Sequence, residues 1–183
     1  MALYQWNIAI SGALFESIAI VEVVVRNELD RNLNVWAKRH VADWLDIIKF
    51  DEKAQVDIQK AHTRVSKESS HGKIVAELNF GFWRFMLGRR YLHEIWLPVM
   101  KSAFPNLEGH AGMRREEVER AVAKIWFLRN RIGHHEPIFN RDFSQDLVAM
   151  ESLLNWISFE AASWARSQSR IDDVLKLKPQ FPG

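Results

Sequence analysis

The chain has 183 residues, 48% of them hydrophobic, with eight tryptophans and no cysteine, and its formal net charge is +2. This length suits one domain with a single core, and the lack of cysteine excludes disulfide bonds and thiolate metal sites. The small net charge provides no strong overall field for nucleic acid, so such a role has to depend on local clusters of charged side chains.

Apolar residues recur every three or four positions from Ile8 to Trp36, which predicts a first long helix. The N-terminal region is apolar enough to resemble a signal peptide or a membrane anchor. However, no basic segment precedes it, and polar side chains interrupt every stretch of about 18 apolar residues. These interruptions are Gln5, Asn7, Ser11, Glu16, Ser17 and Glu22. We therefore expect a core helix, no membrane partner and, because cysteine is absent, a cytoplasmic location.

Three further helices are predicted in the central part of the chain. A polar segment from Asp51 to Lys67 predicts an exposed helix. Lys73–Leu87 and Tyr91–Ala103 predict two more, which Gly88 separates.

The next helix is expected from Arg114 to Arg131. Gly133 follows it at the position where a helix cap favours a residue with positive φ, and Pro137 prevents the helix from resuming at once. Asp142 and Gln145 then resemble a capping box that opens a last long helix, which continues to about Trp164.

These segments together predict an all-α protein, a bundle of about six to seven helices. We expect a single helical domain over residues 1–166 and a polar C-terminal tail over residues 167–183. No internal repeat and no low-complexity tract is present.

The stretch "LRNRIGHHEPIF", Leu128–Phe139, places many ionisable side chains at one helix boundary. On a regular helix Arg129 and His134 would point about 140° apart. If Gly133 ends the helix, however, His134 can fold back beside Arg129 and Asn130.

Such a set is chemically sufficient to cleave RNA without a metal or another cofactor. An imidazole can take a proton from a ribose 2′-hydroxyl or give one to a leaving 5′-oxygen. A guanidinium can bind the phosphate oxygens and stabilise the charge of the transition state. The spacing alone is weak support, since Arg64 and His71 lie similarly far apart in a polar segment.

With its neighbours, this stretch resembles the signature of the Abi-like (abortive infection) proteins of the HEPN superfamily, an Arg followed by a polar residue and then a His. Two other segments resemble the family in the expected order: "NIAISGALFESIAIVEVVVRNEL", Asn7–Leu29, and "GKIVAELNFGFWRFML", Gly72–Leu87. Together the three segments extend over most of the chain.

The resemblance implies a HEPN-like helical fold and a homodimer in which two motifs form one composite active site. Some members of the superfamily are metal-independent endoribonucleases that act as toxins or in phage defence. The resemblance implies that Arg129 and His134 are catalytic, with Asn130 as the polar residue between them. The roles of His135 and Glu136 stay open. A cognate antitoxin is a candidate partner, although Glu136 stands where some HEPN toxins carry the Tyr that an antitoxin modifies.

Several alternatives remain. Arg129 and His134 could be structural, and His134, His135 and Glu136 could bind a metal. Three residues of the first helix, Glu22, Arg26 and Asn27, could line the same cleft or form a polar network between helices, and Arg131 is a further candidate. The protein could also be a non-catalytic HEPN module that binds RNA, a nucleotide or a protein, or a helical scaffold.

Overall fold

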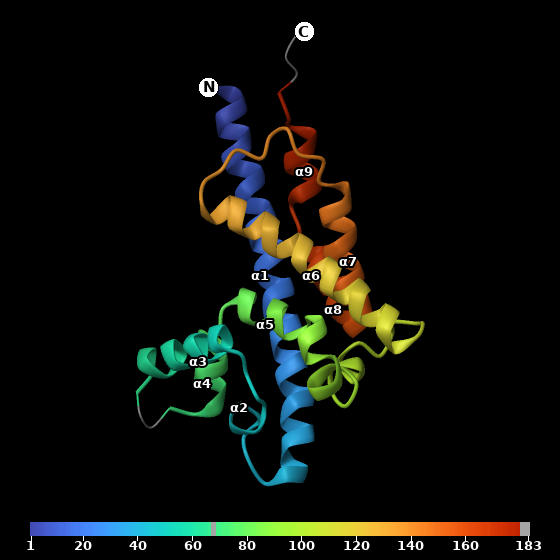
Figure 1. The fold of residues 1–183 in the computed structure, drawn as a ribbon. Helices are drawn as coiled ribbons and strands as arrows, with labels where there is room; N and C mark the ends of the chain where they lie inside the picture. Colours follow the sequence, from blue (N-terminus) through green and yellow to red (C-terminus); the bar gives the residue numbers. More distant parts are fainter. Residues whose placement is uncertain (67–68, 180–183) are drawn as a thin grey trace. The chain divides into compact units, whose positions relative to one another are not determined.

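A computed structural model describes residues 1–66 and 69–179 of the chain (Figure 1). Within these residues all regular structure is helical and no strand occurs, which confirms the predicted all-α class. The α-helices are α1 (Ala2–Ala37), α2 (Trp44–Ile47), α3 (Glu52–Arg64), α4 (His71–Glu77), α5 (Phe80–Met86), α6 (Ala111–Gly133), α7 (Ser144–Ile157), α8 (Phe159–Gln168) and α9 (Ile171–Lys176). Lys67, the expected last residue of the second helix, and residues 180–183 of the expected tail lie outside the described residues.

The chain divides into two compact units. One consists of Met1–Val25 with Arg120–Gly183, and the other of Arg26–Glu119. The helices α1 and α6 each contribute to both units, and each unit is described by itself. The single domain expected over residues 1–166 stays a prediction.

Helix α1 buries one side chain every three or four residues along its whole length. The buried residues are Trp6, Ile10, Ala13, Leu14, Ile18, Val21, Val25, Leu29, Leu33 and Ala37. This spacing keeps them on one face of the helix, as the core interpretation requires. By length and composition alone, the segment Ala2–His40 could also cross a membrane, and 33% of its most apolar window is buried. Core helices and signal sequences pass that same test, so the expected absence of a membrane partner stays a prediction.

In the unit that contains both chain ends, α9 packs beside the N-terminal part of α1 (Figure 1). The indole Nε1 of Trp6 donates a hydrogen bond of 2.8 Å to the carbonyl of Val174, and both Ile171 and Val174 are buried. The segment expected as a polar tail from residue 167 therefore contains a packed helix. The apolar residues at 171 and 174 are one helical turn apart, a signal too short to distinguish from chance in the sequence.

An aromatic core fills the other unit. The rings of Trp44 and Trp83 lie 5.8 Å apart, and Phe82 meets the Trp83 ring edge-on at 5.3 Å. All three side chains are at most 1% exposed. Such ring pairs add stability beyond the area that they bury. Trp83 and Phe82 are therefore core residues of this unit.

Two predicted helices are divided by side chains that start a new helix. The helix expected over residues 73–87 is interrupted at Asn79, whose backbone is extended and whose Oδ1 accepts a hydrogen bond of 3.0 Å from the Phe82 amide. Ser158 separates α7 from α8 in the same way, with its Oγ 3.2 Å from the Ala161 amide. The apolar period continues across both positions, so periodicity alone predicts one helix where two are present.

The prediction of one helix over residues 91–103 is wrong, because Pro98 falls within this segment. Residues 89–103 instead form the 3-10 helices η2 (Arg89–Tyr91) and η4 (Met100–Ala103) and the π-helical η3 (Leu92–Trp96). Proline has no amide hydrogen for the bond to the fourth residue before it. The preceding amide, of Leu97, instead bonds to the carbonyl of Leu92, five residues back, at 2.9 Å.

The expected capping box is also wrong. Asp142 Oδ1 accepts a hydrogen bond from the Ser144 amide, but the first residue before α7 is Phe143, which makes no side-chain cap. Gln145 accepts a hydrogen bond from Lys124 at 2.7 Å instead of reaching back to the start of the helix.

Replacing Asn79 with alanine is expected to destabilise the protein by about 1 kcal/mol, because the first turn of α5 loses its side-chain cap. Asn79→Asp retains an acceptor oxygen and should remain within about 0.5 kcal/mol of the wild type. Urea unfolding of both variants measures the difference. Equal stability of Asn79→Ala and Asn79→Asp would contradict the capping role.

Candidate functional site

The polar stretch 128–139 begins in the last turns of α6, whose last helical residue is Gly133, but the left-handed residue that caps this helix is His135. Gly133 is helical, whereas His135 has φ 57°. The amide of His135 bonds to the carbonyl of Ile132 at 3.0 Å, and that of Glu136 bonds to the carbonyl of Arg131 at 2.9 Å. This pair of bonds is the Schellman motif, in which the left-handed position usually holds glycine. The expectation that Gly133 has positive φ is therefore wrong.

The position of His134 therefore differs from the one predicted. Its amide bonds to the carbonyl of Asn130 at 2.9 Å, as in a continuing helix. His134 thus does not fold back at Gly133, and within the part of the chain that the structure describes, no hydrogen bond or ion pair joins its ring to Arg129. Its side chain is exposed at the helix end.

Arg129 is half-buried and held on one side by Glu22 of α1. Its Nε lies 3.5 Å from Glu22 Oε1, and the two side chains are 39% and 26% exposed. At this distance the contact is an ion pair rather than a hydrogen bond, and Nε is a buried atom without a hydrogen-bond partner. The guanidinium extends along the helix toward its C-terminus, since Nη1 lies 3.8 Å from where a Cβ on Gly133 would be. The structure therefore brings two predicted site residues, Arg129 and Glu22, together.

Other polar groups of the stretch hold the loop after α6. Arg131 donates a hydrogen bond of 3.2 Å to the carbonyl of Pro137, and its Nε lies 3.5 Å from Glu136 Oε2. Because both contacts are local and exposed, they contribute little energy but restrict the path of the chain. Arg131 and Glu136, two secondary candidates, thus have a structural role in this conformation.

Two further contacts fix the same loop, and neither was predicted. The amide of buried Ile138 donates a hydrogen bond of 2.9 Å to Asn7 Oδ1 of α1. Arg141 binds Asp146 through two hydrogen bonds of 2.7 Å, and the Asp146 side chain is 1% exposed. A bidentate pair of this kind restricts both position and orientation. The spacing of Arg141 and Asp146 gave no signal, because charged residues five apart are common.

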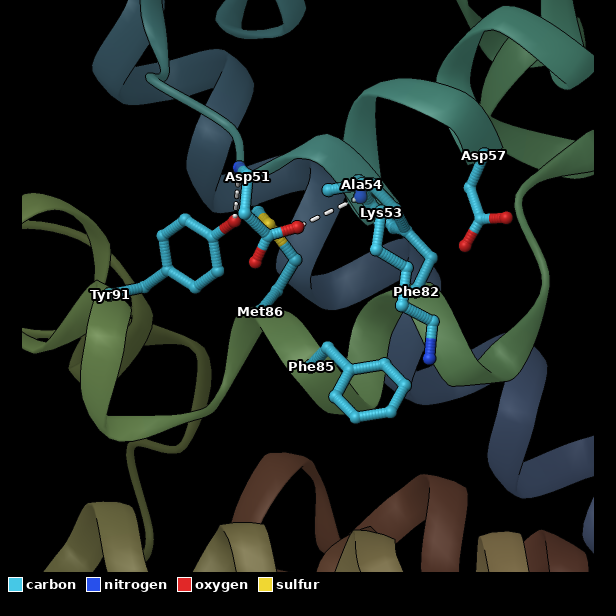
Figure 2. Close-up of a pocket in the computed structure, with 8 residues that line it drawn as sticks. All are labelled: Asp51, Lys53, Ala54, Asp57, Phe82, Phe85, Met86 and Tyr91. Atoms are coloured by element: carbon cyan, nitrogen blue, oxygen red, sulfur yellow. Dashed lines mark hydrogen bonds between the residues drawn. The ribbon is translucent and has the colours of Figure 1, made fainter.

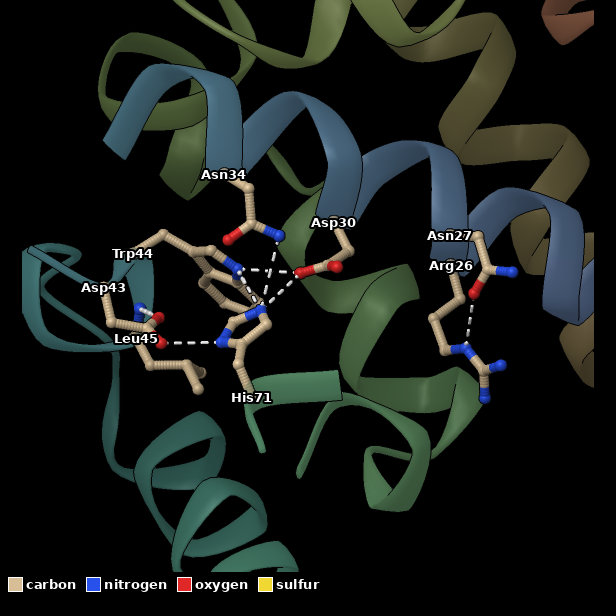
Figure 3. Close-up of polar contacts among 8 residues, drawn as sticks. All are labelled: Arg26, Asn27, Asp30, Asn34, Asp43, Trp44, Leu45 and His71. Atoms are coloured by element: carbon tan, nitrogen blue, oxygen red, sulfur yellow. Dashed lines mark hydrogen bonds and ion pairs between the residues drawn. The ribbon is translucent and has the colours of Figure 1, made fainter. Parts of the chain in front are cut away.

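The remaining candidates have simpler surroundings. Asn130 is half-buried, and its carbonyl accepts the His134 amide. Arg26 Nε donates a hydrogen bond of 3.2 Å to the side chain of its neighbour Asn27 (Figure 3). These two residues belong to the unit Arg26–Glu119, so their predicted place in the same cleft stays a prediction.

Neither of the two described cavities is lined by a residue of the stretch 128–139. One of about 230 Å³ is lined by α1, α7, α8 and the start of α9, with apolar residues such as Met150 and Leu154 beside the ion pair of Glu151 and Arg166. Neither Arg129 nor His134 lines this cavity.

A second cavity, of about 50 Å³, lies between Asp51, Asp57 and the rings of Phe85 and Tyr91 (Figure 2). The ammonium of Lys53 sits 3.6 Å from the centre of the Phe85 ring, a cation–π contact made by the protein itself. The volume is well below that of ordinary ligand pockets.

Among residues 1–66 and 69–179, no group of three or more His, Cys, Asp or Glu side chains is arranged to hold a metal ion.

Comparison with protein-family models found no matching family, and searches of curated proteins and of solved structures found no significant match.

The Schellman ending predicts opposite effects from those expected if Gly133 were the cap. Gly133→Ala should stabilise the protein by about 0.5–1 kcal/mol, because alanine favours a helix and its Cβ would meet only Arg129, at an ordinary 3.8 Å. His135→Gly should be stabilising or neutral, by up to about 1 kcal/mol, because glycine adopts positive φ without strain. Urea unfolding measures both changes.

His135→Ala is the matched control, since it removes the imidazole but keeps the Cβ at positive φ. It should be less stable than His135→Gly by about 1 kcal/mol. A Gly133→Ala variant that loses more than about 1 kcal/mol would contradict this helix ending and restore Gly133 as the cap.

Proposed function

We propose that this protein is a metal-independent endoribonuclease of the Abi-like HEPN type, which cleaves single-stranded RNA in the cytoplasm and acts in phage defence or as a toxin. The observation that carries the proposal is the arrangement at the end of α6. There a half-buried guanidinium, Arg129, and an exposed imidazole, His134, lie on one helix end that the following loop holds in place. The all-α fold and the order of the three resembling segments also support it.

The ion pair with Glu22 suits Arg129 for binding phosphate. Glu22 lies against Nε, at one side of the guanidinium. The two terminal nitrogens of the fork point away from that atom by the geometry of the group and could donate to phosphate oxygens. Because the side chain is held on one side, it would lose less rotational freedom on binding RNA.

The reaction proposed is transesterification within the RNA. The 2′-oxygen attacks the adjacent phosphorus and loses its proton to an imidazole, while the bond from phosphorus to the 5′-oxygen breaks and that oxygen takes up a proton. The products are a 2′,3′-cyclic phosphate and a free 5′-hydroxyl. Arg129 would stabilise the charge on the phosphoryl oxygens.

A homodimer would supply what one chain lacks. The step needs one group that accepts a proton and another that donates one. The resemblance implies that two motifs face each other, so two copies of His134 would serve as base and acid. No hydrogen bond or ion pair joins Arg129 to His134 within the described residues of one chain, which is compatible with a site completed by a second copy.

Purified protein incubated with single-stranded RNA in EDTA is expected to release fragments with cyclic phosphate ends. His134→Ala should lower the cleavage rate by about 10²–10⁴-fold, because it removes the group that transfers protons. Arg129→Ala should lower it by about 10²–10³-fold. Gel electrophoresis and mass spectrometry of the fragment ends provide the measurement.

His135→Gly is the matched control for His134→Ala, because it removes a neighbouring imidazole while its backbone role is kept. It should cleave RNA at a rate similar to that of the wild type. His62→Ala, at an exposed histidine of α3, controls for the loss of an imidazole elsewhere in the protein. Full activity of His134→Ala, or no cleavage by the wild type across varied RNAs, would contradict the proposal.

A non-catalytic RNA-binding module is the second candidate, and the lack of a hydrogen bond or ion pair between Arg129 and His134 within the described chain is equally compatible with it. In that case the wild type would bind RNA without cleaving it. Arg129→Ala would weaken binding and reduce the slope of log affinity against log salt by about 0.7, the contribution of one phosphate contact.

A further inference from the structure

A histidine outside the proposed site is enclosed by two carboxylates. His71, the first residue of α4, has its Nδ1 2.6 Å from Asp43 Oδ2 and its Nε2 2.8 Å from Asp30 Oδ1 (Figure 3). Trp44 and Asn34 complete what we call the His71 cluster: Asp30, Asn34, Asp43, Trp44 and His71. All five residues belong to the unit Arg26–Glu119.

The cluster connects three helices. Asp30 and Asn34 lie one turn apart on α1, Asp43 is the N-cap of α2, and His71 begins α4. Asp43 contacts two of them at once, because its Oδ1 accepts the amide of Leu45 at 2.9 Å while its Oδ2 faces the imidazole.

These distances describe a charged imidazole. A neutral ring has a single N–H and could donate to only one of the two carboxylates, which would leave a lone pair directed at the other. The charged ring donates from both nitrogens. Burial of the ring lowers the pKa of His71, but the hydrogen bonds and charges of Asp30 and Asp43 outweigh it and raise the pKa above its ordinary value of 6.5.

The same cluster contains partners for the neutral ring. Trp44 Nε1 lies 2.9 Å from Asp30 Oδ1 and 3.2 Å from His71 Nε2, so it can donate to either atom. Asn34 Nδ2 lies 3.4 Å from His71 Nε2. When Nε2 loses its proton, these two N–H donors can bond to its lone pair, whereas Asp30 would be repelled from it.

The proton on Nδ1 is the better held of the two. The carboxylate of Asp43, which faces Nδ1, can only accept a hydrogen bond, whereas the N–H groups of Trp44 and Asn34 can donate to Nε2. We therefore expect the neutral ring to keep its proton on Nδ1.

The charged groups that face the ring are the carboxylates of Asp30 from α1 and Asp43 from α2. The contact between α3 and α4 has its own charged pair, Arg64 and Glu77, whose Nη1 and Oε2 are 3.7 Å apart at the far end of α4. Trp44 is buried, and its ring meets the His71 ring edge-on at 5.7 Å. A change in the charge of the imidazole is therefore expected to alter the surroundings of Trp44 in the buried aromatic core.

We propose that the His71 cluster is a proton-operated switch. The charged ring holds Asp30 and Asp43 together. Loss of the Nε2 proton lets Nε2 accept a hydrogen bond from Trp44 or Asn34 instead, and Asp30 is released. The attachment of α4 to α1 then depends on pH. Because the pKa of His71 is raised in the folded protein, the stabilisation is complete below about pH 6.5 and is lost as the pH rises through the raised pKa.

Nuclear magnetic resonance of the whole protein tests the switch. The ring nitrogens of His71 should titrate at a higher pH than those of a histidine in a short unstructured peptide, and the neutral ring should carry its proton on Nδ1. The indole N–H resonance of Trp44, assigned with Trp44→Phe, should shift with the same midpoint. Asp30→Asn and Asp43→Asn should each lower that midpoint, since each removes a negative charge from the ring.

The wild type alone can overturn the proposal. A His71 that titrates at or below the pH of the peptide reference, a neutral ring protonated on Nε2, or a Trp44 resonance unchanged through the titration would each contradict it. Variants that fail to fold therefore do not affect the outcome.

Discussion

The left-handed backbone of His135 is the constraint on which the proposed site depends. At φ 57° it reverses the chain after α6, so that the amides of His135 and Glu136 satisfy the last carbonyls of the helix. The chain that follows is then bound to α1 through Ile138 and Asn7. Without this reversal neither the exposed position of His134 nor the course of the following loop would be defined.

This ending separates the polar residues of the stretch by role. His135, Arg131 and Glu136 determine the path of the backbone after α6. Much of the polar character of the stretch is therefore what a helix end with a tight turn requires. Arg129 and His134 are not needed for that shape. Arg129 is held from the side by Glu22, and His134 is exposed. A structural role therefore does not explain why both residues are present at the same helix end.

Periodicity in the sequence identifies the long helices well, because α1 and α6 bury a residue every turn and the spacing is visible directly. It fails where one side chain changes the backbone: Asn79 and Ser158 begin new helices within continuous apolar periods, and Pro98 converts a predicted helix into π and 3-10 turns. Gly133 misled for a related reason, since glycine permits a left-handed backbone but does not require it. His71 gave no signal, because its partners are 28 and 41 residues away in the sequence.

The central claim is that Arg129 and His134 act on the same phosphate, and it can be tested by observing the histidine rings while a mononucleotide with a 2′,3′-cyclic phosphate, the proposed product end, is added. The account predicts a saturable change in the ring resonances of His134 that Arg129→Ala weakens, with little change at His135. Equal small changes at every exposed histidine, or none at His134, would contradict it.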